Sequence, residues 1–249
     1  MAITICVALQ KGGVGKTTTA EAVAAIIGKQ GKRVLLVDMD SQTNSTFISG
    51  ADPEKTITDV FAGESTTRDA ICHCDNYDLL AADEYLANFE TLDVDPIILK
   101  ECIAEVDPDY DYILIDTPPA LGNLLKASLV ASRWVIIPTD ARPLSIKGLD
   151  ALEATIEAAQ SVSKDLKILG IVLVKYNERT VLNRQIKGLL EERCQDMNTT
   201  VFDAKIREGV AVAEAQAMQQ SLIDYAPKSK PCLDYVDLAN EIMEKAGGM

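Results

Sequence analysis

The residues from Gln10 to Thr18 combine two lysines, three glycines and two threonines directly after an apolar run, Ile3–Leu9. A glycine-rich turn between a strand and a helix points successive backbone N–H groups at one place, beside the positive end of the helix dipole. This arrangement is suited to binding phosphate groups. Within it, Lys16 would reach the β- and γ-phosphates of a nucleotide, and the Thr17 hydroxyl would be a ligand of Mg²⁺. The predicted nucleotide-binding residues of this loop are Lys11, Gly12, Gly13, Val14, Gly15, Lys16, Thr17 and Thr18.

Aspartates follow two further apolar runs. Asp38 and Asp40 come at and after the end of one run, and Asp116 ends the run that starts at Tyr112. In an open α/β sheet, ligands bind at the carboxyl ends of the strands, so these positions favour ligand binding. Asp116 would hold Mg²⁺ through water or through Thr17, because Mg²⁺ tends to keep part of its hydration shell. Asp40 has an alternative role as a helix N-cap, since the residues after it also suit a turn.

Apolar runs of strand length alternate with helical segments along the whole chain. The predicted strands are Ile3–Leu9, Arg33–Asp38, Tyr77–Ala81, Tyr112–Asp116, Trp134–Pro138, Ile168–Lys175 and Thr200–Asp203. The predicted helices are Lys16–Gln30, Asp95–Ala104, Gly122–Ala131, Leu144–Ser163, Leu182–Gln195, Glu208–Gln219 and Lys230–Lys245. This alternation predicts an α/β fold, with a doubly wound and mainly parallel sheet that has helices on both faces. At 249 residues the natural interpretation is one domain, 1–249. The glycine-rich loop, Asp40 and Asp116 would then converge at the C-terminal edge of the strands.

Charge is distributed unevenly along this acidic chain, whose net charge is −14. Residues 52–116 hold 18 Asp and Glu against 3 Lys and Arg, whereas residues 164–207 hold 6 against 9. The acidic block is either a solvated face or a docking surface for a basic peptide. No run reaches the ~18–20 apolar residues of a membrane span, and no leader precedes the first strand, so we expect a cytosolic protein. The six cysteines then favour free thiols, and Cys72-His73-Cys74 lacks the spacing of a zinc site.

The sequence KGGVGKTT at Lys11–Thr18 resembles the deviant Walker A box of the ParA/MinD family of P-loop ATPases. The resemblance implies that Lys11 reaches across a homodimer to the nucleotide of the partner, which makes Lys11, Lys16 and Asp40 the catalytic candidates. It also implies that Asp40 positions the attacking water and senses Mg²⁺. Asp38 would lie near the metal's second shell, and Asp116 would end the Walker B strand. Ser41 stands where the family usually has proline. The metal-site candidates are Thr17, Asp40 and Asp116.

Later segments carry weaker parts of the same resemblance, which spans nearly the whole chain. The family reads adenine with an Asn side chain after a late strand, and Asn177 matches that position, although Asn is also a common turn residue. Phe202–Arg207 resembles the family's I-P-R segment, without the proline and with the arginine one place early. Ile206 and Arg207 are therefore candidate base contacts. Tyr225–Lys230 resembles the Y-x-P-K-S segment that precedes the last helix.

The family contains several functions, of which the first expectation is a ParA-type partition ATPase. Such an ATPase would form an ATP-dependent sandwich dimer, bind DNA without sequence preference, and have its weak hydrolysis stimulated by a ParB-like partner. DNA binding needs a basic patch, and the alternative is an ordinary solvated helix face. The candidate DNA-binding residues are Lys175, Arg179, Arg184, Lys187 and Lys205. Ala211 stands nearest to the family's DNA-contacting arginine.

Two other readings remain open. A MinD-type, membrane-cycling ATPase would need a basic amphipathic helix at the C-terminus. The segment Tyr235–Lys245 is amphipathic but acidic, so anionic lipid would repel it. A positioning ATPase of a secretion, conjugation or polysaccharide machine would need no DNA. The cargo, the replicon and the partner are not specified by the sequence.

Overall fold

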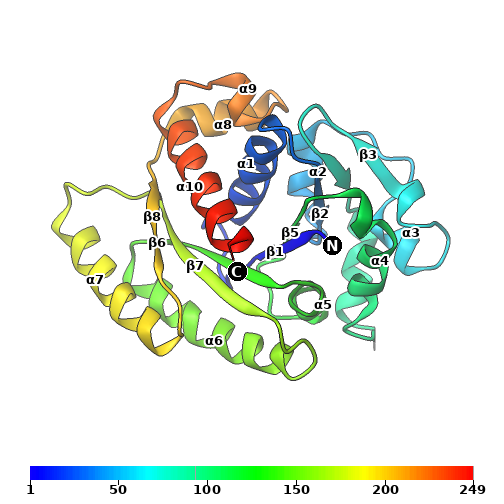
Figure 1. Ribbon diagram of the computed structural model, residues 1–249, viewed down its shortest axis with the longest axis horizontal. Coiled ribbons are helices and arrows are strands. Elements are labelled where there is room, and N and C mark those ends of the chain that lie inside the picture. Colours follow the sequence, from blue (N-terminus) through cyan, green and yellow to red (C-terminus); the bar gives the residue numbers. More distant parts are fainter. Residues whose placement is uncertain (93, 249) are drawn as a thin grey trace.

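One sheet forms the centre of the molecule, and its strand order is β3-β4-β2-β5-β1-β6-β7-β8 (Figure 1). The computed structural model describes residues 1–92 and 94–248. Every neighbouring pair of strands in it is parallel except β3 and β4, which pair antiparallel at one edge. The strands are β1 Ile3–Val7, β2 Val34–Asp38, β3 Ile71–His73, β4 Asp78–Leu80, β5 Tyr112–Asp116, β6 Trp134–Asp140, β7 Lys167–Val174 and β8 Val201–Ile206. The prediction of a doubly wound, mainly parallel sheet is confirmed.

Helices cover both faces of this sheet (Figure 1). Helices α1, α8, α9 and α10 pack on one face in a single apolar cluster, and α4, α5, α6 and α7 pack on the other. The helices are α1 Lys16–Lys29, α2 Asn44–Ser49, α3 Ile57–Phe61, α4 Ile98–Val106, α5 Asn123–Ala131, α6 Pro143–Gln160, α7 Val181–Asp196, α8 Val210–Ala217, α9 Leu222–Tyr225 and α10 Lys230–Gly247. Short 3-10 segments occupy Arg68–Ala70, Glu84–Glu90 and Asp107–Asp109.

The central strands read as continuous apolar runs because both of their faces are buried. All five residues of β5 are buried, and in β1 the side chains of Ile5 and Val7 pack on the α1 face while Cys6 packs on the α5 face. Strands covered on both sides need apolar residues at every position, whereas half-exposed strands alternate. This property made β1, β2 and β5 predictable to within two residues.

The edges of the sheet differ from the predictions. The short strand β3 was not predicted, and β8 continues to Ile206 instead of ending at Asp203. On β8, the backbone N–H groups of Asp203 and Ala204 donate to the Glu241 carboxylate of α10, at 3.1 Å each. A side chain from a distant helix thus satisfies the outer edge of this strand, which no local pattern reveals.

Several short or shifted helices also differ from the predictions. Helices α2, α3 and α9 were not predicted, α4 begins at Ile98 instead of Asp95, and α8 begins at Val210 instead of Glu208. Each unpredicted helix is six residues or shorter, which is too short for a helical periodicity to show in the sequence.

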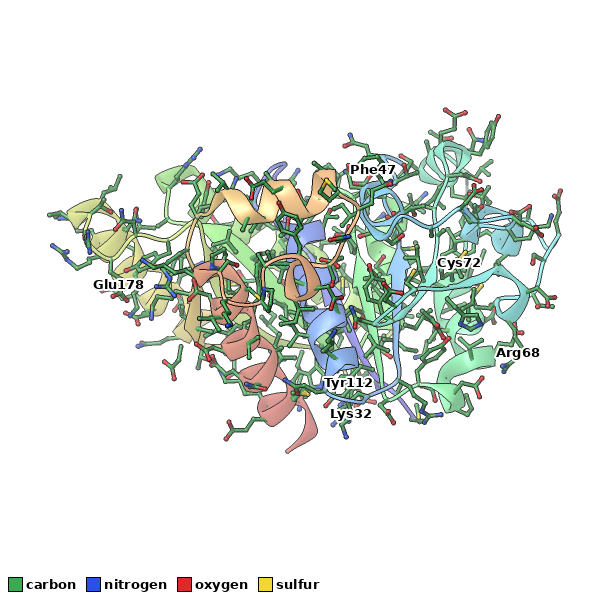
Figure 2. The ribbon with its side chains drawn as sticks, turned by 90° about the horizontal axis from the view of Figure 1, so that it is seen from above. Lys32, Phe47, Arg68, Cys72, Tyr112 and Glu178 are labelled. Atoms are coloured by element: carbon green, nitrogen blue, oxygen red, sulfur yellow. The ribbon has the colours of Figure 1, made fainter. Side chains whose placement is uncertain are left out.

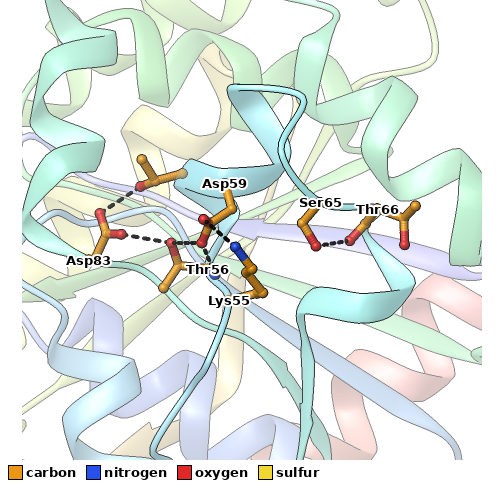
Figure 3. Close-up of polar contacts among 7 residues, drawn as sticks. Lys55, Thr56, Asp59, Ser65, Thr66 and Asp83 are labelled. Carbon is orange, nitrogen blue, oxygen red and sulfur yellow. Dashed lines mark hydrogen bonds and ion pairs between the residues drawn. The ribbon is translucent and has the colours of Figure 1, made fainter.

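Part of the acidic block has a structural role inside the segment that carries it (Figure 3). Asp59 accepts the Thr56 backbone N–H at 2.8 Å and closes the capping box of α3. Asp83 accepts the hydroxyls of Thr56 and Thr58 at 2.7 and 2.6 Å. These carboxylates stabilise the start of α3 and join it to the segment that contains Asp83. Some of the acidic residues of 52–116 therefore have a structural role and do not simply form a solvated face.

Two further sequence expectations concern cysteines and membrane spans. All six cysteines are free thiols, and burial raises the pKa of Cys72 and Cys74. Cys72 lies in β3, and Cys74 directly follows that strand. Among the described residues, none of the helices has the length and apolar character needed to cross a bilayer.

Helix α1 approaches the loop before β4 so closely that Gly28 has no room for a side chain. A Cβ at Gly28 would lie 1.6 Å from the backbone oxygen of Asn76. We expect Gly28→Ala to lower the free energy of unfolding by roughly 1–3 kcal/mol, because α1 or the loop must shift. Gly188→Ala in α7 is the matched control, since nothing lies within 4 Å of its Cβ. Alanine there should stabilise the protein by up to about 1 kcal/mol through its higher helix propensity. Urea unfolding of both variants checks this, and equal effects would contradict it.

Candidate functional site

Three neighbouring strands bring the predicted site residues to one edge of the sheet. In the order β2-β5-β1, Asp38 stands opposite Asp116, and Asp116 stands opposite Val7. The loop after β1, the segment after β2 and the end of β5 therefore meet at the carboxyl edge, as predicted. This is the place where open parallel sheets bind ligands.

The loop between β1 and α1 takes a shape that depends on glycine. Gly13 and Gly15 have φ of 72° and 76°, in the left-handed region that residues with a Cβ adopt at a cost. Helix α1 begins directly after, at Lys16, so its unpaired N–H groups face the loop. Val14 turns into the core and is 1% exposed, so its side chain anchors the loop and does not face the cavity.

Lys16 is the charged group at the centre of the loop. Its side chain is almost buried, at 7% exposure, and its Nζ donates to the backbone oxygen of Lys11 at 3.3 Å. Burial lowers the pKa of Lys16, and the negative charges of Asp116 and Asp40 work in the opposite direction. An ammonium group with one long hydrogen bond in a low-dielectric site has capacity for an anionic ligand.

Asp38 and Asp116 form a buried acidic pair beside this lysine. Both are fully buried, and burial is the main reason that the pKa of each is raised, with mutual proximity adding to the rise for Asp116. Asp38 accepts the Thr46 N–H and hydroxyl on one oxygen, at 2.9 Å each, and the Asp40 N–H on the other. Asp38 is therefore saturated by protein donors and holds the segment after β2 in place.

Asp116 is different, because one of its oxygens makes no hydrogen bond of normal geometry with the described residues. Its Oδ2 accepts the Ser45 hydroxyl at 2.9 Å, whereas its Oδ1 is buried without such a bond, and the Thr17 hydroxyl lies close enough to lower the pKa of Asp116. A buried carboxylate oxygen left unsatisfied is costly unless a ligand completes it. Asp116 and the neighbouring Thr17 hydroxyl are oxygen donors of the type that Mg²⁺ prefers, so the residues fit the predicted ion.

Protein carboxylates alone would not enclose a metal ion here. The described residues contain no group of three or more carboxylate, imidazole or thiol side chains placed to hold one. A Mg²⁺ ion at this edge would therefore take most of its ligands from phosphate and water, as Mg²⁺ sites with few protein ligands do.

Asp40 lies on the wall of the same cavity. It is 6% exposed, and its Oδ1 accepts the Gln42 N–H at 3.0 Å, which closes a turn. The alternative of a helix N-cap does not apply, because Thr43 is the N-cap residue of α2. One oxygen of the Asp40 carboxylate thus stabilises the turn through the Gln42 N–H, and this hydrogen bond fixes the orientation of the side chain at the cavity wall.

A cavity of about 470 Å³ extends from the glycine loop to the end of β8. Its predicted lining residues are Gly12, Gly13, Gly15, Lys16, Thr17, Thr18, Asp40, Ile206 and Arg207. Lys175, which the sequence offered as a DNA-binding candidate, also lines it. The lining residues that the sequence did not suggest for any site are Gln42, Asn44, Ile48, Pro119, Val174, Glu208, Gly209, Val212, Ala213, Gln216 and Tyr235. Most of them come from α2, from α8 and from the ends of β7 and β8. Most of these residues follow the carboxyl end of a strand, but finding them from the sequence would have required knowledge of the order of the strands in the sheet.

Asn177, the third predicted base contact, does not line this cavity. It lies in a neighbouring hollow of about 760 Å³ that shares Lys175, Arg207 and Glu208 with the cavity. Its Oδ1 accepts the Arg179 N–H at 3.0 Å, which is the turn role that was its alternative. The structure therefore brings Ile206 and Arg207 to the cavity and leaves Asn177 beside it.

Lys11 is held within its own chain. Its Nζ donates to Asp140 Oδ1 at 2.8 Å, and the other oxygen of Asp140 lies 3.2 Å from Arg142 Nε. Asp140 ends β6 next to β1 and is 6% exposed, whereas the Lys11 side chain is 27% exposed, so only the carboxylate of this pair is buried. Sequence reasoning did not identify Asp140.

Glu178 lies at the end of the molecule opposite Arg68 and Cys72 (Figure 2), and three of the candidate DNA-binding residues, Lys175, Arg179 and Lys205, line the same hollow as Glu178. Several of these side chains make hydrogen bonds or ion pairs within the chain. Lys175 donates to the Gly13 oxygen at 3.1 Å, Arg184 to the Glu178 oxygen at 2.8 Å, and Lys205 to the Asp203 oxygen at 3.0 Å. Lys187 pairs with Glu191.

Comparison with known proteins gives consistent matches. Residues 2–168 match a family model described as an AAA domain. The sporulation initiation inhibitor protein Soj of Bacillus subtilis is 36% identical, over 96% of this chain and 97% of that protein. The chromosome-partitioning ATPase Soj of Thermus thermophilus is 35% identical, over 97% and 95%. A solved structure named cobyrinic acid a,c-diamide synthase from Mycobacterium smegmatis, with bound ADP and magnesium, is 31% identical, with a TM-score of 0.85 and coverage of 100% and 97%.

Proposed function

The chain belongs to the ParA/Soj family of P-loop ATPases, and we propose that it is a partition ATPase that binds and hydrolyses ATP with Mg²⁺. One observation carries this proposal: a single cavity contains the glycine loop, Lys16, Thr17 and Asp40 at one end and the β8 residues Ile206 and Arg207 at the other. A cavity of this volume, with phosphate-binding groups at one end and an apolar side chain beside a guanidinium group at the other, suits a nucleotide.

Each residue at the phosphate end has a distinct role in the proposed reaction. The backbone N–H groups of Gly13 to Thr18 and the Lys16 ammonium bind and orient the triphosphate. Thr17 and Asp116 would hold Mg²⁺, which supplies charge neutralisation at the phosphates. Asp40 orients the water that attacks, because its carboxylate lines the cavity while Asp38 fixes its backbone.

We place a homodimer in the active state, with Lys11 of each subunit acting on the nucleotide of the partner. Exposed apolar side chains close in sequence to lining residues of the cavity support a covering partner: Phe47 precedes Ile48 and is 58% exposed, Val210 follows Gly209 at 77%, and Met218 lies two residues after Gln216 at 61%. Phe47 lies beside the end of α8 (Figure 2), where Gln219 Nε2 donates to its backbone oxygen at 3.0 Å. A second copy that faces the cavity would cover these residues together.

In the proposed function, the dimer acts in the cytoplasm, where it binds DNA without sequence preference and a ParB-like adaptor stimulates its ATP hydrolysis. Residues 164–207 have a net positive balance, and the dimer doubles it, which supports non-specific binding to phosphates. One observation favours a second candidate, a positioning ATPase that binds no DNA. The ion pair between Lys187 and Glu191, together with the net charge of −14, reduces the basic surface available for DNA.

The variant Asp40→Ala tests this function. We expect it to bind ATP, to hydrolyse it at least about a hundredfold more slowly, and to accumulate as a dimer. With ATP it should co-sediment with DNA, and the bound fraction should fall steeply as salt rises, because phosphate contacts release counterions. Phosphate release, size-exclusion chromatography and sedimentation at several salt concentrations measure the three effects.

Asp40→Asn is the matched control, because its amide oxygen can still accept the Gln42 N–H and keep the turn. If the carboxylate orients the attacking water, this variant loses hydrolysis as well. If Asp40 only holds the turn, Asp40→Asn remains active, and the catalytic assignment is wrong. A dimer that forms with ATP but does not sediment with DNA at low salt would favour the second candidate.

A further inference from the structure

Arg207 and Asp234 join the end of β8 to the start of α10 by an unusually complete contact. Asp234 Oδ2 accepts the Arg207 backbone N–H at 2.9 Å and its Nε–H at 2.8 Å, while Oδ1 accepts Nη2 at 2.5 Å. One carboxylate therefore fixes both the main chain and the side chain of the same arginine. Two parallel hydrogen bonds from a guanidinium to a carboxylate define its plane as well as its position.

The burial of Asp234 sets this pair apart from a surface ion pair. Asp234 is 8% exposed as a residue, whereas the Arg207 side chain is 49% exposed. Removing the partner of a buried charge is costly, while two exposed charges contribute little. The buried Asp234 carboxylate thus holds the Arg207 guanidinium in place, while the guanidinium itself remains partly exposed to solvent.

Those surroundings are the base end of the candidate nucleotide site. Arg207 lines both the 470 Å³ cavity and the adjoining 760 Å³ hollow, so it forms part of the wall between them. The contacts with Asp234 use Nε and Nη2, which leaves Nη1 and the two faces of the guanidinium plane for other partners. A guanidinium held in one plane can stack on an aromatic ring.

The same turn of α10 also reaches the phosphate side of the cavity. Tyr235, the next residue, lines the cavity, and its hydroxyl lies 3.4 Å from Thr19 Oγ1 on α1. On α8, Gln216 donates to Thr18 Oγ1 at 2.9 Å. The start of α10 therefore spans the cavity from α1 to β8, and Asp234 is its anchor on the β8 side.

We propose that Asp234 is a positioning residue for the base of the bound nucleotide, acting through Arg207, whose guanidinium plane it holds as a wall of the base pocket. This inference rests on the proposed nucleotide-binding function. It adds that selectivity for a nucleotide over bare phosphates depends on a carboxylate that itself does not line the cavity.

The test compares two probes, ATP and inorganic tripolyphosphate, which has the phosphate chain without a base. Calorimetry with Mg²⁺ present gives the dissociation constant of each for the full-length chain. We expect Asp234→Asn and Arg207→Ala each to weaken ATP binding by about tenfold, because stacking and cation–π contacts with a base are lost. Tripolyphosphate binding should stay at the wild-type value, since Lys16 and the glycine loop are unchanged.

The double variant shows whether Asp234 acts through Arg207. Adding Asp234→Asn to Arg207→Ala should cause no further loss of ATP affinity, because coupled residues are not additive. Asp237→Asn is the matched control, because Asp237 lines the same hollow on the same helix and acts on Arg207 through its charge, whereas the hydrogen bonds that hold the guanidinium plane come from Asp234. Its ATP affinity should be that of the wild type.

Several results would overturn the inference. Wild-type ATP affinity in Asp234→Asn, or an equal loss of ATP and tripolyphosphate affinity, would show that Asp234 is only structural. If Asp234→Asn does not fold, Arg207→Lys tests the same point, because lysine keeps the charge without the planar fork. Unchanged ATP affinity in that variant would also overturn it. Failure of the wild-type protein to bind either probe would instead refute the proposed nucleotide-binding function.

Discussion

Replacing Lys16 with alanine is expected to abolish ATP binding, with at least about a hundredfold loss of affinity, as for removal of one partner from a buried charge pair. Lys16 is the buried cation of the glycine loop, at 7% exposure, and its Nζ has a hydrogen bond only to the Lys11 oxygen, at 3.3 Å, within the described part of the chain. A triphosphate bound without this lysine would place several negative charges beside Asp40 and Asp116. Calorimetry with Mg-ATP measures the loss.

Lys29→Ala is the control for a lysine lost from the same helix. Lys29 lies at the other end of α1, where it pairs with Asp224, and it does not line the cavity. Its loss should leave the ATP dissociation constant within about twofold, in keeping with the small energies of exposed ion pairs. Wild-type ATP affinity in Lys16→Ala would contradict the assignment of the phosphate site.

The residues proposed for the phosphate end could be placed at one edge of the sheet from the sequence, because the signals are local. Lys16 and Thr17 follow the buried strand β1 within ten residues, and Asp116 comes directly after the four apolar residues Tyr112–Ile115. Parallel strands then align their carboxyl ends by necessity, which brought Asp40 and Asp116 to the same edge. No contact between distant segments had to be known for this part of the prediction.

The base end could not be predicted in the same way, because it is built from long-range contacts. Asp234 is 27 residues from Arg207, and although Asp234 lies on the buried face of α10 and Asp237 on the exposed face, no local pattern identifies Arg207 as the partner of Asp234. Asn177 shows that a local match also does not fix where a side chain lies. Its position matched a family pattern, but the structure uses its side chain to close a turn with Arg179, outside the lining of the cavity.

The contact of Lys11 could not be predicted from local sequence either, because its partner Asp140 lies 129 residues away. In a single chain the Lys11 Nζ lies 2.8 Å from this buried carboxylate. For Lys11 to reach a nucleotide in a second subunit, as we propose, this contact must open. Phosphate oxygens carry more negative charge than one carboxylate, so a bound triphosphate on the partner can compete for the ammonium.

The variant Lys11→Ala is therefore expected to bind ATP as a monomer and to lose both dimerisation and hydrolysis. Two nucleotides buried face to face bring several negative phosphates together, and each Lys11 would offset that repulsion and stabilise the charge that develops during transfer. Binding within one chain depends on Lys16 and the glycine loop, which remain. Size-exclusion chromatography with Mg-ATP and a phosphate-release assay measure the two losses.

The variant Asp140→Asn distinguishes a Lys11 that acts on the nucleotide of the partner subunit from a Lys11 that only pairs with Asp140 in its own chain. The substitution removes the charge that holds Lys11 in the monomer but leaves the lysine, so dimerisation and hydrolysis should be retained. If Lys11 acts only by pairing with Asp140, the two variants must behave alike, since each breaks the same ion pair. Loss of activity in Lys11→Ala together with its retention in Asp140→Asn assigns the lysine to the partner's nucleotide. Equal activity of both variants and the wild type would leave Lys11 as a structural residue of its own loop.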